Sequence, residues 1–159
     1  VESLEVRALV LALDRGSGRP LREGIPSAIA TGLAIGAGEG LGIGSYQVVT
    51  AAPGKSWGFR GVARTTFIGS TLGGLGGAAY GYFVRPSPKK NMLFASSVIW
   101  GAAIGSEIGG GASKPWASWA DTNDSFALGG LVGFNVALAG AAGLSLVWTP
   151  SWNQLAWMW

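Results

Sequence analysis

Four apolar segments of this sequence carry a small residue at every fourth position, and this spacing constrains the fold more than any other feature. The segments cover residues 27–50, 65–84, 91–112 and 125–147. The glycines that make up the spacing are Gly32, Gly36, Gly40, Gly44, Gly69, Gly73, Gly77, Gly81, Gly101, Gly105, Gly109, Gly129 and Gly133. Ser97, Ala137 and Ala141 complete the pattern. Gly69, Gly101 and Gly133 also recur every 32 residues, which indicates a repeated unit of one segment and one loop.

The lengths of the segments and the placement of charge predict an integral membrane protein. As a helix, each segment would be ~30–36 Å long, which is enough to span a hydrocarbon core of about 30 Å. Charged residues make up 12% of the chain, against roughly 25% in soluble domains, and most lie outside the four segments. We therefore expect residues 25–159 to form a multi-pass transmembrane domain that is incomplete at its C-terminus. Residues 1–24 are expected to be a short helix and a polar segment.

A four-residue repeat fits two kinds of secondary structure, because it keeps small residues on one face of a helix and also on one face of a strand. A transmembrane β-barrel in an outer membrane is therefore the alternative. The segments, however, have 20 or more residues, against about 10 for a barrel strand. The sequence favours an all-α membrane protein with at least four glycine-rich transmembrane helices in tandem hairpins, and hence an inner rather than an outer membrane.

Glycine has a specific use in such helices. In water each Gly would cost a helix ~1 kcal/mol relative to Ala. In a bilayer the backbone must satisfy its own hydrogen bonds, so the helix forms despite its glycines. Gly then lets two backbones approach closely and gain van der Waals contact. We predict that the small-residue faces pack helices tightly, within the chain or between subunits.

Glu39 and Glu107 are the two charged residues inside the four segments. An ionised carboxylate within a membrane is costly unless it is paired, hydrated or protonated. Near the middle of its segment, Glu39 is either a structural contact or a group that handles protons or cations, and the structural interpretation is favoured. Its candidate partners are Ser70, Thr71 and Asn135. Glu107 lies nearer a segment end, where headgroup water reaches it.

The sequence predicts no catalytic, metal or cofactor site. It has no His and no Cys, the side chains that most zinc and haem sites use. Leu41 stands where a dinucleotide-binding fingerprint needs its last Gly, and Val49 where a phosphate-binding loop needs its first. The net charge of +3 is modest and predicts no nucleic-acid partner.

The basic residues of the loops predict that the N-terminus lies inside. Seven basic residues fall on the N-terminal side of the membrane: Arg7, Arg15, Arg19, Arg22, Arg85, Lys89 and Lys90. Four fall on the opposite side: Lys55, Arg60, Arg64 and Lys114.

By their small-xxx-small spacing, residues 27–147 resemble the general class of glycine-zipper membrane proteins. That class includes channel-forming subunits of mitochondrial inner-membrane protein translocases. The resemblance carries over no function and no site residue. We expect a non-enzymatic structural or assembly subunit of a larger complex, whose partners are the lipid bilayer and other membrane protein subunits or further copies of the chain. A channel or transporter component that uses Glu39 is the alternative.

Overall fold

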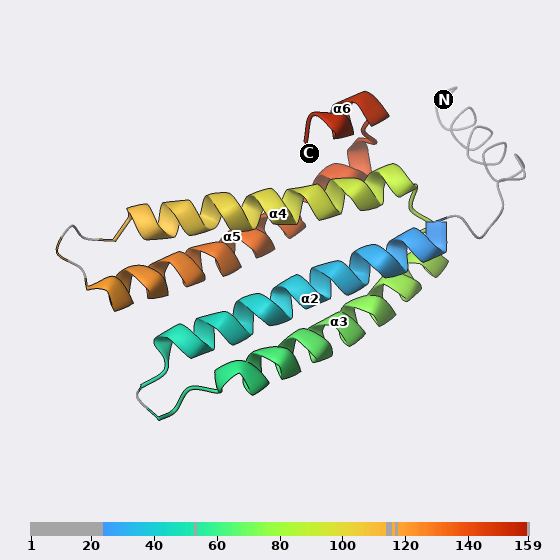
Figure 1. Ribbon diagram of the computed structural model, residues 1–159. Coiled ribbons are helices and arrows are strands. Elements are labelled where there is room, and N and C mark those ends of the chain that lie inside the picture. Colours follow the sequence, from blue (N-terminus) through green and yellow to red (C-terminus); the bar gives the residue numbers. More distant parts are fainter. Residues whose placement is uncertain (1–23, 53, 114–115, 117, 159) are drawn as a thin grey trace, which may run out of the picture.

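The computed structural model describes residues 24–52, 54–113, 116 and 118–158 (Figure 1). Within these ranges the helices are α2 (Gly24–Thr50), α3 (Gly58–Phe83), α4 (Pro88–Gly111), α5 (Trp119–Val147) and α6 (Trp152–Ala156). Apart from Gly24, the N-terminal short helix and polar segment expected over residues 1–24 lie outside the described residues.

The part of the chain that the structure describes contains helices and no strand. The prediction of an all-α protein is therefore confirmed here, and the β-barrel alternative is wrong. Each apolar segment runs as one continuous helix of 24 to 29 residues. The pair Gly73-Gly74, which a barrel would have used as a turn, lies inside α3.

The long helices begin earlier than the uncharged segments suggest. α3 starts at Gly58 rather than near residue 65, and it includes Arg60 and Arg64. The absence of charge therefore marks the apolar middle of each helix and not its first turn. Serine caps give two of the starts a local cause. Ser87 precedes Pro88 and accepts a hydrogen bond from the Lys90 amide, and Ser118 forms a capping box with Asp121.

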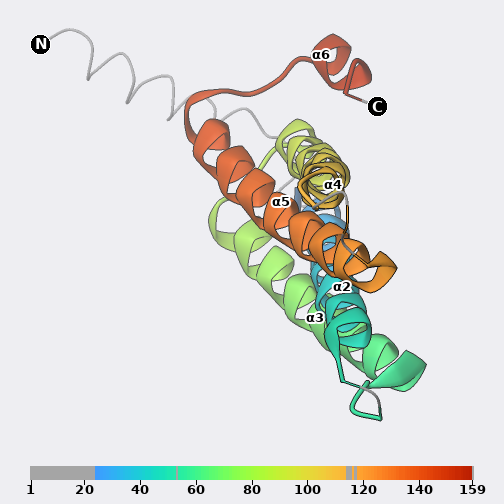
Figure 2. The same ribbon diagram turned by 90° about the vertical axis from the view of Figure 1, so that its left-hand side faces the viewer.

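The four long helices form two antiparallel hairpins (Figures 1 and 2). α2 packs along α3, and α4 packs along α5. Both hairpin turns lie at the left end of Figure 1, and the connection from α3 to α4 lies at the right end. α2 joins the hairpins, because it also contacts α4 and α5, whereas the backbone of α3 approaches no described helix other than α2.

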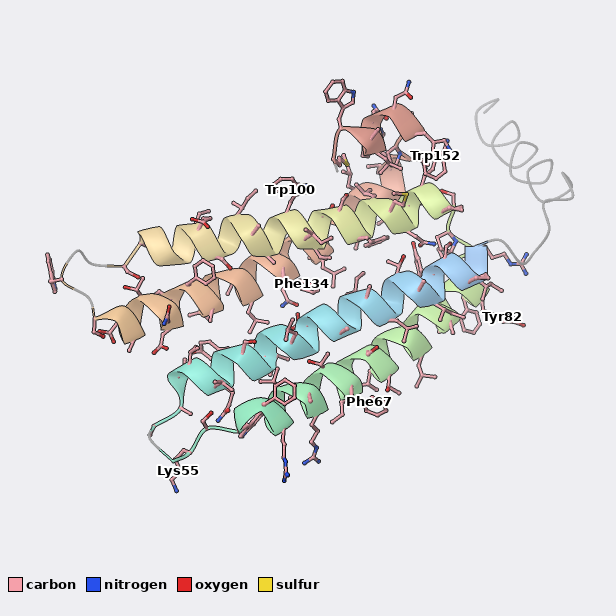
Figure 3. The ribbon with its side chains drawn as sticks, viewed as in Figure 1. Lys55, Phe67, Tyr82, Trp100, Phe134 and Trp152 are labelled. Atoms are coloured by element: carbon pink, nitrogen blue, oxygen red, sulfur yellow. The ribbon has the colours of Figure 1, made fainter. Side chains whose placement is uncertain are left out.

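Little of the apolar surface is buried inside the chain. The buried apolar side chains are those of Ala28, Leu93, Val98, Phe134, Ala141 and Leu155. Many larger ones point outward, including Phe59, which is 85% exposed, and Phe67, which is 73% exposed. Figure 3 shows Phe67 on the outer side of α3. Exposure of so many large apolar side chains is typical of a membrane-embedded or partner-covered surface.

Two of the four long helices are apolar enough to cross a membrane, where the sequence analysis expected four. They are Pro88–Gly111 and the Ala120–Val147 part of α5. α2 and α3 have the length but not the hydropathy. Glycine contributes little apolar surface, α2 also carries Glu39, and α3 carries Arg60 and Arg64 together with several hydroxyl side chains.

The segment after α5 turns back onto α4. The short helix α6 packs there, with Leu155 1% exposed. The Trp100 indole Nε1 donates to the Met158 carbonyl oxygen at 2.7 Å, and the Lys89 ammonium lies 5.6 Å from the Trp152 ring centre. In the described residues this segment is a five-residue helix that lies on α4, and Ser151 caps it immediately after Pro150.

Candidate functional site

The glycines of α2 and α3 face one another across the first hairpin. A Cβ atom at Gly36 would overlap the Gly69 carbonyl oxygen, and a Cβ at Gly69 would overlap the Gly36 carbonyl oxygen. Gly32 and Gly73 are related in the same way. The other predicted packing glycines of this hairpin also lie against the opposite helix: Gly40 on Thr65, Gly44 on Val62, Gly77 on Ala28 and Gly81 on Ile25. No side chain larger than hydrogen fits between most of these backbones.

The second hairpin repeats this arrangement. Gly105 and Gly129 each lie against the carbonyl oxygen of the other, as do Gly101 and Gly133. Gly109 lies against the carbonyl oxygen of Ser125. A glycine Cα placed directly against a carbonyl oxygen is the geometry of a Cα–H···O contact, which recurs where helices pack closely. The thirteen glycines singled out by their spacing all lie at contacts between paired helices.

Other glycines behave differently, and the spacing alone does not separate them. A Cβ at Gly76, Gly111, Gly140 or Gly143 would meet no atom within 4 Å. Gly38 and Gly42 contact the second hairpin instead, through Phe134 at 3.0 Å and Leu131 at 3.2 Å from the position of a Cβ. Figure 3 labels Phe134 on α5. The sequence analysis did not list Gly38 and Gly42 as packing residues. Both glycines lie two residues from members of the main series, and this offset was the sequence signal that a second face of α2 also carries small residues.

Glu39 lies on α2 and accepts hydrogen bonds from Asn135 of α5. The Asn135 amide nitrogen is 3.1 Å from Oε1 and 3.0 Å from Oε2 of the carboxylate. The same nitrogen is 2.9 Å from the Leu131 carbonyl oxygen of its own helix. Asn135 is one of the three partners considered from sequence. Of the other two, Thr71 donates to the Phe67 carbonyl oxygen of its own helix at 2.9 Å.

The Glu39 carboxylate belongs to the wall of a groove between the hairpins. We call this the Glu39 groove. It has a volume of about 490 Å³. Its lining comes from residues 32–43 of α2, residues 65–73 of α3, and Phe134, Asn135 and Leu138 of α5. The Thr65 hydroxyl donates to the Val62 carbonyl oxygen at 2.9 Å, so its hydrogen is used within α3. The other polar side chains of the described lining are Glu39 and Asn135.

A second groove lies on the other side of α2, between α2 and the α4–α5 hairpin. Its volume is about 660 Å³, and its lining combines apolar side chains, among them Leu41, Ile99, Phe126 and Leu131, with the polar side chains of Ser45, Ser106 and Asn123. None of the described residues that line it is charged, so it has no counterpart of the Glu39 carboxylate.

Glu107 lies apart from both grooves. Its side chain is exposed on α4, four residues before the helix ends at Gly111. It has no hydrogen-bond or ion-pair partner within the described ranges. The structure therefore does not bring the two predicted carboxylates together. Among the residues that it describes, no cluster of three or more metal-ligating side chains forms.

A polar contact at the connection end joins the hairpins, and the sequence pattern did not predict it. The buried Asn91 side chain of α4 donates to the Ser27 hydroxyl of α2 at 2.7 Å. Nearby, within the second hairpin, the Lys90 ammonium of α4 donates to the Ser145 carbonyl oxygen of α5 at 2.7 Å. Asn and Lys at the start of an apolar segment look like ordinary headgroup-facing residues, so the pattern held no signal for these bonds. With the Asn91–Ser27 bond in place, the second hairpin is held against α2 at two depths, here and at Glu39.

No protein-family model, curated protein or solved structure matches this chain. The interpretation of the grooves and of the glycine faces therefore rests on their geometry and chemistry.

Proposed function

We propose that this chain is a non-enzymatic integral membrane protein that serves as a structural or assembly subunit of a larger membrane complex. The observation that carries the proposal is the outward-facing apolar surface. In the two helices that are apolar enough to span a membrane, only 17% and 22% of the apolar windows are buried inside the chain. The core helix of a water-soluble protein would be mostly buried, so these helices need lipid or another protein around them.

We propose further that α2 and α3 cross the membrane together with α4 and α5. Their glycine faces are covered by each other, their backbone hydrogen bonds are internal to the helices, and α2 packs on the second hairpin. A helix of low hydropathy is tolerated in a bilayer when its polar groups find partners on neighbouring helices. Arg60 and Arg64 lie within the first two turns of α3, and long basic side chains of this kind extend along a helix toward the headgroups. A helical bundle of this kind favours an inner over an outer membrane.

The role as a subunit follows from how the small-residue faces are used. Reciprocal glycine contacts make each hairpin a close-packed unit, and the thirteen glycines of the four-residue spacing are all used within the two hairpins. The surfaces that remain for partners are the apolar outer faces and the two grooves, of which the Glu39 groove alone has a charged residue in its described lining. A rigid body with a large apolar exterior and one polar group in a groove suits an assembly role.

Extraction from membranes and native size test the proposal together. We expect the chain to stay in the membrane pellet at alkaline pH, and to run in a mild detergent as part of an assembly larger than one chain. Release into the soluble fraction would refute membrane integration. A monodisperse single chain, retained in membranes but associated with nothing, would refute the role as a subunit.

A channel or transporter component is the second candidate function, and one observation favours it: a carboxylate near the middle of α2 faces a groove. Glu39→Gln separates the two candidates in sealed vesicles. Unchanged assembly with loss of a proton or cation flux would favour transport, and loss of assembly without any flux in the parent protein would favour the subunit.

A further inference from the structure

We infer that the Glu39 groove is the docking site for a transmembrane helix of another subunit, and that this helix presents a lysine or arginine to Glu39 near the middle of the bilayer. The inference rests on the proposed function, because it names the site and the kind of partner through which the subunit would assemble.

The first step is the depth of the carboxylate. Glu39 is 15 residues from the start of α2 and 11 from its end, which places it ~22 Å and ~16 Å from the two ends by helical rise. Asn135 lies at a comparable place in α5, 16 residues from the start and 12 from the end. If the helices span the membrane, both groups lie deep in the hydrocarbon, where an unpaired carboxylate is costly.

The second step is the count of hydrogen bonds. The Asn135 amide nitrogen has two hydrogens but three acceptors within 3.1 Å: both carboxylate oxygens and the Leu131 carbonyl oxygen. When one hydrogen serves Leu131, a single N–H is left for a carboxylate that has about four acceptor sites. Asn135 therefore positions Glu39 without satisfying it, and a charged donor would complete the site.

The third step is the supply of cations within the chain. Five of the six basic residues of the described part lie near helix ends or in turns: Lys55, Arg60, Arg85, Lys89 and Lys90. Arg64 lies deeper, because its neighbour Thr65 contacts Gly40 of α2, and it shares a face of α3 with Ile68 and Leu72, which line the groove. Its side chain is exposed, and the described residues contain no ion pair between it and Glu39. The missing cation is therefore assigned to a partner.

The fourth step is the shape of the groove. Its α2 wall runs from Gly32 to Ile43, about 16 Å or three helical turns, parallel to the helices. The backbones of α3 and α5 make no contact with each other, so no described helix closes the space between them. A lipid acyl chain would fit the apolar lining, but it has no donor to offer a carboxylate at this depth. A helix with one central basic residue matches both the lining and the charge.

Synthetic transmembrane peptides provide the test. The probe is a Leu/Ala host helix with identical ends and Lys, Leu or Glu at its central position. Binding to the full chain in lipid nanodiscs would be followed by energy transfer to a dye at an introduced Ser151→Cys. We expect the Lys peptide to bind at least about tenfold more tightly than the Leu peptide, and the Glu peptide to bind weakly. Glu39→Gln should abolish this preference, whereas Glu107→Gln, which removes an exposed carboxylate outside the groove, should leave it intact.

Three outcomes would overturn the inference. One is binding of the Lys and Leu peptides within about twofold of each other. Another is a Lys preference that survives Glu39→Gln, or one that survives Leu138→Trp, a substitution that fills the groove. Leu128→Trp, at an exposed position of α5, is the matched control. The third is a preference that emerges only in Arg64→Leu, since Arg64 would then already serve Glu39. Retention of the chain in membranes and in its assembly, without any Lys preference, would refute this docking site and leave the proposed function standing.

Discussion

Glu39 and Asn135 stand 96 residues apart in the sequence, yet a single amide group contacts both oxygens of the carboxylate. Apart from hydroxyl side chains, few polar groups lie deep in the four long helices, so this contact strongly constrains how the hairpins dock. In an apolar environment, a buried acceptor that loses its donor costs more than a pair of groups that are both removed. This asymmetry allows the contact to be measured.

Replacing Asn135 alone should therefore destabilise the protein more than replacing both Glu39 and Asn135. We expect Asn135→Leu to lower the free energy of unfolding by about 1–3 kcal/mol, because the Glu39 carboxylate then has no donor among the described residues. The double variant Glu39→Leu/Asn135→Leu should be closer to the parent protein. Reversible unfolding in mixed detergent micelles, followed by circular dichroism, measures all three. Strictly additive effects of the two substitutions would show that the contact contributes nothing.

The sequence could predict part of this site. A lone carboxylate in a glycine-rich segment identifies Glu39 as unusual, and the scarcity of polar residues in the other segments limits its partners to a few, Asn135 among them. The choice among them could not be predicted, because it depends on how α5 lies on α2. That docking involves Gly38 beneath Phe134, and the small face that Gly38 and Gly42 form does not indicate which side chain covers it. The sequence pattern likewise did not predict the Asn91–Ser27 hydrogen bond.

Among the elements, the paired helices show why spacing alone is an incomplete guide to packing. Residues at i and i+4 share a helix face, so the spacing predicts which glycines lie together on one side. It does not say which glycines outside the series face open space. Gly73 and Gly76 belong to the same helix, yet Gly73 lies against the Gly32 carbonyl oxygen and Gly76 meets nothing within 4 Å.

This difference predicts opposite responses to one added methyl group. Gly73→Ala should destabilise the protein by about 1–3 kcal/mol, because its Cβ would overlap the backbone of α2. Gly76→Ala should be neutral or stabilising by up to about 1 kcal/mol, because Ala favours a helix and the site is open. Leu72→Ala, which shortens a side chain that is 64% exposed, should also be mild. Thermal unfolding in detergent compares the three, and equal losses for Gly73→Ala and Gly76→Ala would contradict backbone packing.

α6 gives a second prediction at this scale. Leu155 is 1% exposed, whereas its neighbour Trp157 is 91% exposed, so Leu155 is the buried side chain through which α6 packs, beside the Trp100–Met158 bond and the contact of Lys89 with Trp152. We expect Leu155→Ala to loosen the segment by about 2–3 kcal/mol. In a Met158→Cys background, maleimide labelling at residue 158 should then become faster. Trp157→Ala is the control and should leave the labelling rate unchanged. Faster labelling in both variants would mean that the segment is not docked through Leu155.

At the scale of the whole molecule, the sequence predicts which residues form helices better than it predicts whether lipid or other helices surround them. Long apolar segments with at most one charged residue each predicted the existence and order of α2 to α5, because a stretch of this length has few alternatives to a helix in a membrane. The pairing into consecutive hairpins followed from short connections. The sequence is a weaker guide to whether α2 and α3 cross the membrane. Glycine has no side chain, which allows close packing but also lowers the mean hydropathy of a helix. Stability inside a bilayer comes from contacts between helices, which a single segment does not contain.

Residue accessibility on the two faces of a membrane decides whether all four long helices cross it. The chain has no Cys, so single cysteines can replace Lys55, Ala112, Ser87 and Ser151. Residues 55 and 112 lie at the hairpin turns, and 87 and 151 at the opposite end of the bundle. In sealed vesicles, an impermeant maleimide should therefore label the first two from one side and the last two from the other. The predicted N-inside orientation would place 87 and 151 inside. If residue 55 were labelled from the same side as 87 while 112 was not, then α4 and α5 alone would span, and the α2–α3 hairpin would lie against one face of the membrane.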